Sequence, residues 1–220
     1  MTTDATSSAP PAGLRESKKQ ETRQLISDVS TGLFLTQGFE RTTIAEIAAA
    51  ARVAKKTVTN YFPRKEDLAL DHQDAFIASL AHTVTGRRVG ESALSALRRA
   101  FLDAATDANP VAGFSGPDFA RMVADSPTLT ARLRDLHDQR EEALAVALAE
   151  TAAAIEASSI APRAAAALLG AAHRLLFRRI QELTLAGRPN DVIAATLAPE
   201  AAHVFDLLEG ALGDSPTATA

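Results

Sequence analysis

The chain has 220 residues and a net charge of −4, with 46% hydrophobic and 23% charged residues. This is an ordinary globular composition, with enough residues for one large core or for a small domain plus a larger one. The absence of cysteine excludes disulfides, thiolate catalysis and cysteine-based zinc sites. No apolar run approaches the ~20 residues that span a bilayer, and the first residues lack the pattern of a signal peptide. We therefore expect a cytoplasmic protein with no membrane partner.

Helix-forming residues dominate the chain. Alanine, the best helix former, is abundant, and no run of alternating β-branched or aromatic residues indicates a strand. We therefore expect an all-α fold. Residues 1–14 are expected to form a flexible tail. Apolar residues at helical spacing then indicate a first helix from Ser17 to about Gln37, which Gly38 ends in a left-handed conformation.

Two short helices joined by a tight turn are predicted next. Thr42 or Thr43 caps the first of them, and Glu46 completes a capping box with Thr43. After a break near Arg52, the second covers roughly residues 54–61. Three helices in ~50 residues, with the last two short, are typical of a helix-turn-helix, whose second helix enters the DNA major groove.

The composition of segment 54–61 suits contact with DNA. Its polar side chains can neutralise phosphates or bond to base edges and backbone oxygens: Lys55, Lys56, Thr57, Thr59 and Asn60. Only Val58 is clearly apolar, whereas a purely structural helix of this length usually shows more apolar positions. The segment is therefore predicted to be the recognition helix.

The charges are divided unevenly along the chain. All five lysines lie within the first 65 residues, and residues 15–65 contain ten Lys and Arg against five Asp and Glu. Residues 71–220 contain 13 Lys and Arg against 19 Asp and Glu. This asymmetry is expected when only one part of a protein meets phosphate groups. Basic residues near a terminus can also serve solubility alone, so charge by itself leaves both interpretations open.

Residues 23–70 resemble, without a gap, the N-terminal domain of the tetracycline-repressor (TetR) family. The matching landmarks are Leu33-Phe34, Gly38, Thr42-Thr43, Ile47-Ala48, Val53, Thr57, Tyr61-Phe62 and Lys65-Glu66. The resemblance implies a ligand-responsive transcriptional regulator that acts as a repressor. It implies a helix-turn-helix DNA-binding domain at 15–64 and a helical ligand-binding and dimerisation domain at 65–213, followed by a flexible tail at 214–220.

The resemblance also assigns roles to individual residues of the expected DNA interface. Thr43 would bond to a phosphate, as would Lys65 at the start of a fourth helix. The DNA face would be lined by Thr57, Asn60 and Tyr61, with Tyr61 on the DNA backbone. We place the neighbouring Thr42 at the same interface.

Three positions depart from the family pattern. Arg52 stands where the family usually has glycine, Lys56 where a small residue is common, and Thr59 where an aromatic residue is common. These differences indicate an operator sequence of the protein's own. The basic segment 13–23, together with YFPRKEDL, resembles regulators that bind acyl thioesters or similar apolar ligands. The same basic residues could follow the minor groove as an arm or simply be solvated.

The larger part of the chain is predicted to be helical throughout. We expect a long linking helix at 65–85, helices at 91–108, 116–124, 127–157, 162–186 and 199–212, and a shorter piece at 190–197. Prolines at their starts or breaks set these boundaries.

The last two long helices carry apolar stripes. These include Leu168, Leu169, Ala172, Leu175, Leu176 and Leu183, then Val204, Phe205, Leu207, Leu208 and Leu212. Such stripes are most simply monomer core. In the TetR family, however, the final two long helices pair with a second copy, so the resemblance implies a homodimer. Its recognition helices would lie ~34–36 Å apart and read a near-palindrome.

A pocket for a small-molecule effector is expected between the helices of this larger part. The candidate lining residues are Phe76, Phe101, Phe114, Phe119, Met122, His173 and Phe177. Each of these side chains could equally be ordinary core.

Signatures of catalysis and metal binding were sought and are not found. The sequence has no Gly-rich phosphate loop and no G-x-S-x-G motif, and its five histidines lack zinc-site spacing. We expect no catalytic residue, no metal and no cofactor. Two other classes stay open: a helical small-molecule binder or enzyme that does not use DNA, and an interaction module whose basic segment meets an acidic protein.

Overall fold

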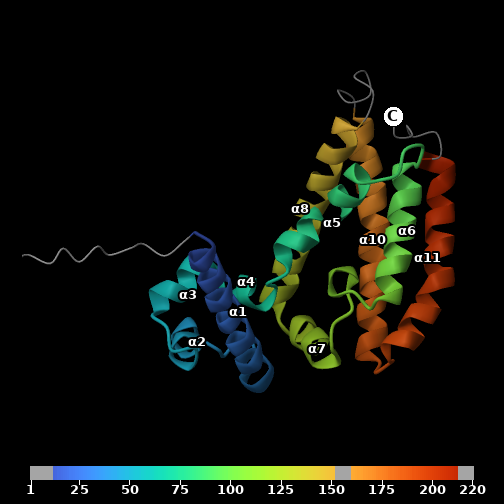
Figure 1. Ribbon diagram of the computed structural model, residues 1–220. Helices are drawn as coiled ribbons and strands as arrows, with labels where there is room; N and C mark the ends of the chain where they lie inside the picture. Colours follow the sequence, from blue (N-terminus) through green and yellow to red (C-terminus); the bar gives the residue numbers. More distant parts are fainter. Residues whose placement is uncertain (1–11, 152–159, 213–220) are drawn as a thin grey trace, which may run out of the picture. The chain divides into compact units, whose positions relative to one another are not determined.

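The computed structural model describes residues 12–151 and 160–212, and all of its regular elements are helices (Figure 1). The expected all-α fold is confirmed. Contacts divide the chain into two compact units, Met1–Asp71 and His72–Ala220. The expected tails at 1–14 and 214–220 lie outside the described residues, except that residues 12–14 belong to the first helix. In the described ranges, no helix is both long and apolar enough to cross a membrane.

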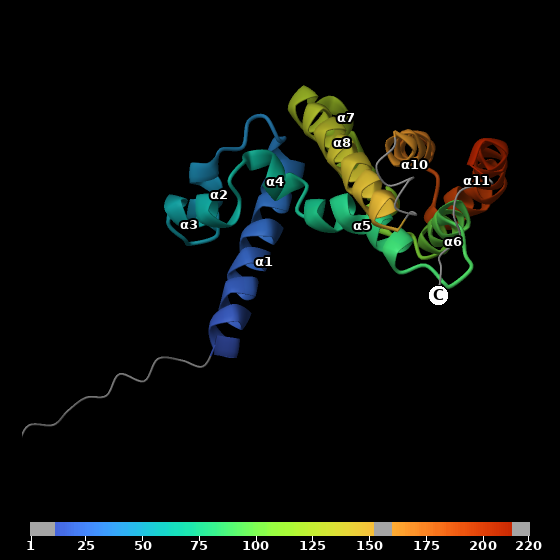
Figure 2. The same cartoon turned by 90° about the horizontal axis from the view of Figure 1, so that it is seen from above.

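The first unit consists of four helices around a small apolar core. They are α1 (Ala12–Gln37), α2 (Ile44–Ala50), α3 (Lys55–Tyr61) and α4 (Lys65–Ala69). The core side chains are at most 2% exposed and comprise Ile26, Phe34, Phe39, Ile47, Val58, Phe62 and Leu68. The N-terminal half of α1 extends beyond the other helices of the unit (Figure 2), and side chains 15–21 are all exposed. Packing in this unit therefore depends on α1 from residue 22 onward.

The local signals at the end of α1 and at the start of α2 act as predicted, whereas the expected start at Ser17 is wrong, because α1 already begins at Ala12. Gly38 follows α1 with φ of +87°, a conformation that glycine adopts without strain. Thr43 caps α2, and both halves of its capping box with Glu46 are present.

The expected single helix at 65–85 is wrong, because the chain forms two helices there. α4 ends at Ala69, and α5 (Gln73–Thr85) begins after a turn. Leu70 has a non-helical backbone (φ −110°, ψ 52°), and Asp71 accepts a hydrogen bond from Ser27 Oγ on α1. This bond ties the end of α4 to the first unit, and α4 itself contacts α1.

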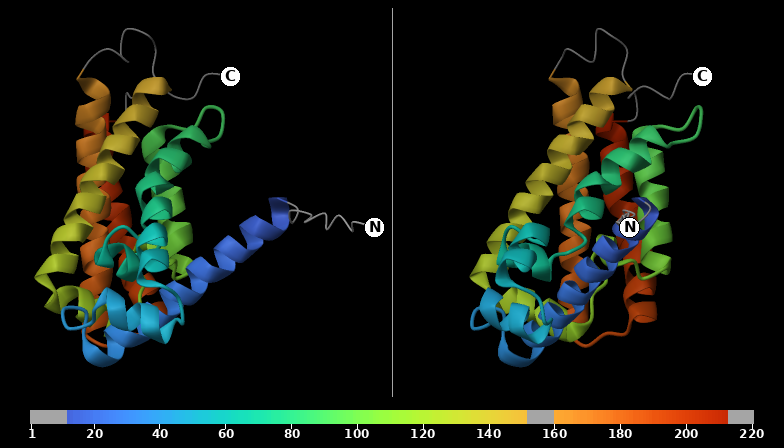
Figure 3. Two further views of the ribbon diagram at one scale, coloured as in Figure 1. Left: turned by 90° about the vertical axis from the view of Figure 1, so that its left-hand side faces the viewer. Right: turned by 60° about the vertical axis from the view of Figure 1, so that its left-hand side comes forward.

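The second unit is a bundle of longer helices. Its elements are α5, α6 (Ala93–Thr106), the 3-10 turn η1 (Pro110–Ala112), α7 (Pro117–Asp125), α8 (Pro127–Glu150), α10 (Ala161–Leu185) and α11 (Asn190–Leu212). Helix α11 runs alongside both α6 and α10, and α8 lies against α5 and α10 (Figures 1 and 3). The segment 152–157 of the expected helix 127–157 lies outside the described residues.

The expected break between 190–197 and 199–212 is also wrong, because α11 continues through Pro199. Ile193, Leu197, Ala201 and Phe205 recur every four residues and are at most 1% exposed. They form one continuous inward face on both sides of the proline. Pro199 itself is exposed, so its ring faces away from the core. Packing of this face outweighs the one backbone hydrogen bond that the proline removes.

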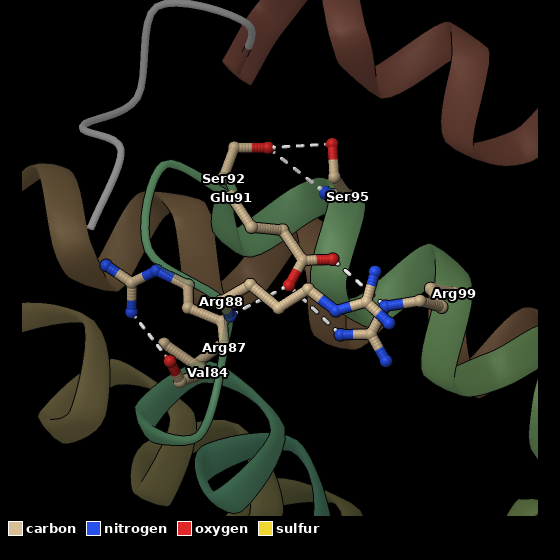
Figure 4. Close-up of polar contacts among 7 residues, drawn as sticks. All are labelled: Val84, Arg87, Arg88, Glu91, Ser92, Ser95 and Arg99. Carbon is tan, nitrogen blue, oxygen red and sulfur yellow. Dashed lines mark hydrogen bonds and ion pairs between the residues drawn. The ribbon is translucent and has the colours of Figure 1, made fainter.

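A polar cluster fixes the start of α6. Ser92 caps the helix, and its Oγ accepts from the Ser95 N–H at 3.1 Å. Glu91 accepts two hydrogen bonds from the Arg99 guanidinium, each at 3.0 Å, and one from the Arg88 N–H at 3.0 Å (Figure 4). The bidentate pair holds the loop between α5 and α6 against α6. Helix α6 lines the cavity described below.

Candidate functional site

Helix α3 presents a polar face to solvent. Lys55, Lys56, Thr59 and Asn60 are exposed, whereas Val58 is fully buried against the core of the unit. The Thr59 hydroxyl donates to the Lys56 carbonyl at 3.1 Å, which leaves its oxygen able to accept. No acidic residue lies on α3 or in the turn before it. This face therefore carries positive charge and short hydrogen-bonding groups.

The end of α3 is held by an arginine that sequence reasoning did not single out as a positioning residue. Arg23 on α1 donates from Nη1 to the Tyr61 carbonyl at 3.3 Å, and its guanidinium lies 4.4 Å from the centre of the Phe62 ring. The side chains of Thr57 and Tyr61 are half-buried. Two features of the sequence could have indicated this contact. They are a basic residue on the inner face of α1 and an aromatic residue directly after α3.

Thr43 uses its hydroxyl within the capping box. Its Oγ1 accepts from the Glu46 N–H at 3.2 Å and donates to Glu46 Oε2 at 2.8 Å. Hydrogen bonds from the Thr43 backbone and side chain lower the pKa of Glu46. A phosphate at this helix start would compete with the Glu46 carboxylate for the same hydroxyl proton.

Thr42 is placed away from the surface, which corrects its assignment to the DNA interface. Its side chain is 1% exposed, and its hydroxyl donates to the Gly38 carbonyl at 2.9 Å. This bond closes the loop between α1 and α2. The side chain is therefore structural.

The ammonium group of Lys65 also bonds to other residues of the first unit, whereas a phosphate contact was expected of it. Its Nζ donates to the carbonyls of Phe39 (2.9 Å), Thr42 (3.2 Å) and Glu40 (3.4 Å). It also lies 4.2 Å from the centre of the Phe39 ring. An ammonium group has three donors, so these carbonyls occupy all of them. Lys65 joins the start of α4 to the α1–α2 loop.

Arg52 adopts the left-handed conformation that glycine would adopt without strain. Its φ is +54°, and its side chain is exposed at the turn between α2 and α3. A non-glycine residue pays about 1 kcal/mol or more for this conformation. The turn thus keeps its shape despite the departure from the family pattern.

A cavity of about 130 Å³ lies in the second unit. Its walls come from α5, α6, η1 and the loop before it, α8 and α10, and the lining residues are Ser79, Leu80, Thr83, Leu97, Ala100, Phe101, Ala104, Asn109, Val111, Ala112, Arg140 and His173. Most of these side chains are apolar, and the few polar ones come from α5, α8, α10 and the α6–η1 loop. This is the usual composition of a small-molecule site.

Two of the seven expected pocket residues, Phe101 and His173, line this cavity. The other five do not: Phe76, Phe114, Met122 and Phe177 are buried elsewhere in the unit, and Phe119 is half-buried on α7. Phe76 and Phe177 instead pack with His137, with ring centres 5.0–5.8 Å apart. Those aromatic residues act as core, which is the alternative interpretation left open above.

The polar cavity residues were missed by sequence reasoning. Ser79 and Thr83 lie four residues apart on α5, a spacing that places both on one face of the helix and could have indicated a polar patch. Arg140 gave no such signal, because it lies in the polar run DLHDQREE, which is typical of a solvated face.

Arg140 and His173 are the ionisable groups of the cavity wall. Arg140 is 6% exposed, its Nε donates to Ser79 Oγ at 2.9 Å, and its guanidinium lies 4.5 Å from the centre of the Phe76 ring. Burial lowers the pKa of Arg140 to about 9, which leaves it charged at neutral pH. Burial, together with the charge of Arg140, lowers the pKa of His173 well below its usual value, so His173 is neutral.

No group of three or more His, Asp or Glu side chains in the described residues could hold a metal ion.

Comparison with known proteins assigns the first unit. Residues 26–71 match the family described as bacterial regulatory proteins, tetR family. The HTH-type transcriptional regulator TcmR of Streptomyces glaucescens is 36% identical over 89 residues. Residues 26–71 therefore match the DNA-binding domain of TetR-family regulators. The aligned residues are 40% of this chain and 39% of TcmR, so the match covers well under half of either protein.

Solved structures match over most of the chain. A tetR family transcription regulator from Shewanella sp. PV-4 is 21% identical, with a TM-score of 0.51, over 86% of this chain and 97% of that one. The SmeT–triclosan complex is 17% identical, with a TM-score of 0.54, over 87% and 91%. At these identities the likeness shows the fold, a helix-turn-helix unit followed by a larger helical unit.

Proposed function

We propose that this protein is a TetR-family transcriptional repressor that binds a near-palindromic DNA operator as a homodimer and is released by a small-molecule effector. The exposed face of α3 is the observation that carries the proposal. It combines Lys55 and Lys56 with Thr59 and Asn60 on the helix that follows the turn.

In this role the exposed side chains of α3 divide between affinity and specificity. Lys55 and Lys56 neutralise phosphates, which gives affinity without sequence preference. Thr59 and Asn60 reach base edges, and an Asn side chain can bond bidentately to adenine. Half-buried Tyr61 lies at the edge of the face and meets the DNA backbone. Thr57 is also half-buried and borders the same face.

Dimerisation through α10 and α11 is supported by exposed leucines. Leu168 and Leu175 are 42% and 48% exposed and lie seven residues apart, which places them on one face of α10. Leu207 on α11 is 67% exposed. By contrast, Leu169 and Leu176 are buried in the core. The stripes predicted from the sequence therefore split into a core face and an outer face, and the outer face is available to a second copy.

The effector would bind in the cavity of the second unit. A ligand that binds one conformation of this unit better than another shifts the population toward it by its differential affinity. If the favoured conformation spaces the two α3 helices wrongly for the operator, DNA affinity falls.

The test is a fluorescence-anisotropy titration of the full-length protein against labelled fragments of its own upstream DNA. We expect one fragment to bind at least roughly a thousandfold more tightly than a scrambled fragment of equal length, which is the lower end of the range for specific binders. Affinity should fall steeply with salt. Equal affinity for all fragments, or binding insensitive to salt, would contradict the proposal. Asn60→Ala should alter base preference. If this variant instead loses the same affinity for every operator variant, Asn60 does not read bases.

A further inference from the structure

The cavity wall contains a buried positive charge that no acid in the described part of the chain pairs with. Arg140 is 6% exposed and makes one side-chain hydrogen bond, to the neutral hydroxyl of Ser79. No carboxylate of the described residues forms an ion pair with it, whereas Arg174 and Arg179 each pair with two acids. Burying an unpaired charge is costly, and proteins normally compensate it. Because the guanidinium lines a cavity, a bound anion can supply the compensation.

His173 supplies a second unsatisfied group in the same wall. Its Nε2 is buried and has no hydrogen-bond partner among the described residues. The ring packs between Phe101 and Phe205, with ring centres 5.8 and 5.6 Å away. A buried orphan nitrogen of this kind needs an explanation. As a neutral imidazole, His173 can donate one hydrogen bond to an acceptor in the cavity.

The rest of the cavity limits the size and charge of such an anion. The volume of about 130 Å³ is close to that of an engineered protein cavity of about 150 Å³ that holds benzene. Leu80, Leu97, Phe101 and Ala104 provide apolar and aromatic surface for a flat ring. Among the described residues, Arg140 alone brings a positive charge to the wall, which fits one negative charge better than the two of a phosphate monoester.

We propose that this cavity binds a small aromatic monocarboxylate, with its carboxylate at Arg140 and His173 and its ring against Leu97 and Phe101. The inference deepens the proposed function, on which it rests, by naming the chemical class of the effector. Arg140 would pair with the carboxylate through its terminal nitrogens while Nε keeps its bond to Ser79.

The experiment compares benzoate with benzamide, a neutral molecule of nearly the same shape, on the full-length protein. Thermal unfolding and isothermal titration calorimetry are both measured. We expect benzoate to raise the Tm and benzamide to leave it unchanged. Arg140→Met should remain folded, because it replaces a buried charge with an apolar side chain of similar length. It should weaken benzoate binding on the order of tenfold to a hundredfold. The control is Arg134→Met, an exposed arginine on the same helix, and it should bind benzoate like the wild type.

Three results would overturn the inference: no binding of benzoate, equal binding of benzamide, or unchanged binding by Arg140→Met. The comparison of the two probes needs only the wild-type protein, so it holds even if the variant fails to fold. The DNA titration is independent of this outcome. If the protein binds its operator but not benzoate, the proposed function stands and this inference fails. If it binds benzoate but no operator, only the assignment of the cavity as a carboxylate site stands.

Discussion

The ammonium of Lys65 lies 4.2 Å from the centre of the Phe39 ring and donates to the Phe39 carbonyl at 2.9 Å. Two more carbonyls of the same loop complete its coordination. The residue therefore acts on the helix-turn-helix by holding α4 to the loop that precedes α2.

Lys65→Met should lower the stability of the first unit. Loss of hydrogen bonds from a charged group and of a cation–π contact predicts a decrease of about 1–3 kcal/mol in the free energy of unfolding. Urea unfolding measures this. Lys55→Met is the control, because Lys55 is exposed on α3 and its loss should change stability by less than about 0.5 kcal/mol. If the two variants are equally stable, the Lys65 contacts do not stabilise the first unit.

Arg52→Gly should stabilise the protein slightly. Glycine removes the strain of φ +54° but gains entropy in the unfolded chain, so the net increase is about 0.5–1 kcal/mol. Arg52→Val should instead lose about 1 kcal/mol, because a β-branched residue tolerates this conformation poorly. Chemical denaturation of the three proteins gives the order Gly, Arg, Val. A valine variant as stable as the glycine variant would contradict the left-handed geometry of this turn.

Stability should fall as the pH drops from neutral toward 4. Burial, and then the charge of Arg140, lower the pKa of His137 to about 4, against roughly 6.5 in the unfolded chain. The unfolded state therefore binds more protons across this window, and the stabilisation present above pH 6.5 is lost on acidification. Between pH 7 and pH 5 the loss from His137 is about 2 kcal/mol. The lowered pKa of His173 acts in the same direction.

Urea unfolding at pH 7, 6 and 5 measures this slope. His137→Gln should flatten it, because glutamine does not titrate. His82→Gln, at an exposed position on α5, should leave the slope as in the wild type. A slope unchanged by His137→Gln would assign the pH dependence to other groups.

Leu175→Glu should shift the protein from dimer to monomer. Leu175 lies on the outer face of α10, and a charge in an apolar interface is strongly unfavourable. Sedimentation velocity measures the mass. Val89→Glu is the matched control, because Val89 is 74% exposed in the loop before α6, outside the proposed interface. A dimeric Leu175→Glu protein, or a monomeric wild type, would remove this interface.

Local patterns predicted the helices well, and long-range contacts account for the errors. The capping box of Thr43 and Glu46 needs only residues three apart, so the sequence contains the whole signal. The break after Ala69 depends on Ser27 and Asp71, which are 44 residues apart. The continuity of α11 through Pro199 depends on packing that the proline alone does not reveal.

The same distinction applies to the candidate site. The exposed face of α3 follows from composition and spacing within one short helix. The role of Lys65 does not, because its partners lie 23–26 residues earlier. Arg140 lies among polar neighbours in the sequence, and only the packing of α8 against α5 and α10 buries it. Whether a charged side chain is buried depends on tertiary packing. The chemistry of the cavity could therefore not be predicted from the sequence.

The most direct test of DNA binding by α3 is the salt dependence of operator affinity for the double variant Lys55→Ala/Lys56→Ala. Each lost phosphate contact reduces the slope of log affinity against log salt by about 0.9, so two lost contacts predict a decrease of about 1.8 with weaker binding at every salt concentration. The control, Arg121→Ala/Arg134→Ala, removes the same charge from exposed positions of the second unit and should keep the wild-type slope. An unchanged slope for the lysine variant, or an equal change in both, would contradict DNA recognition by this helix.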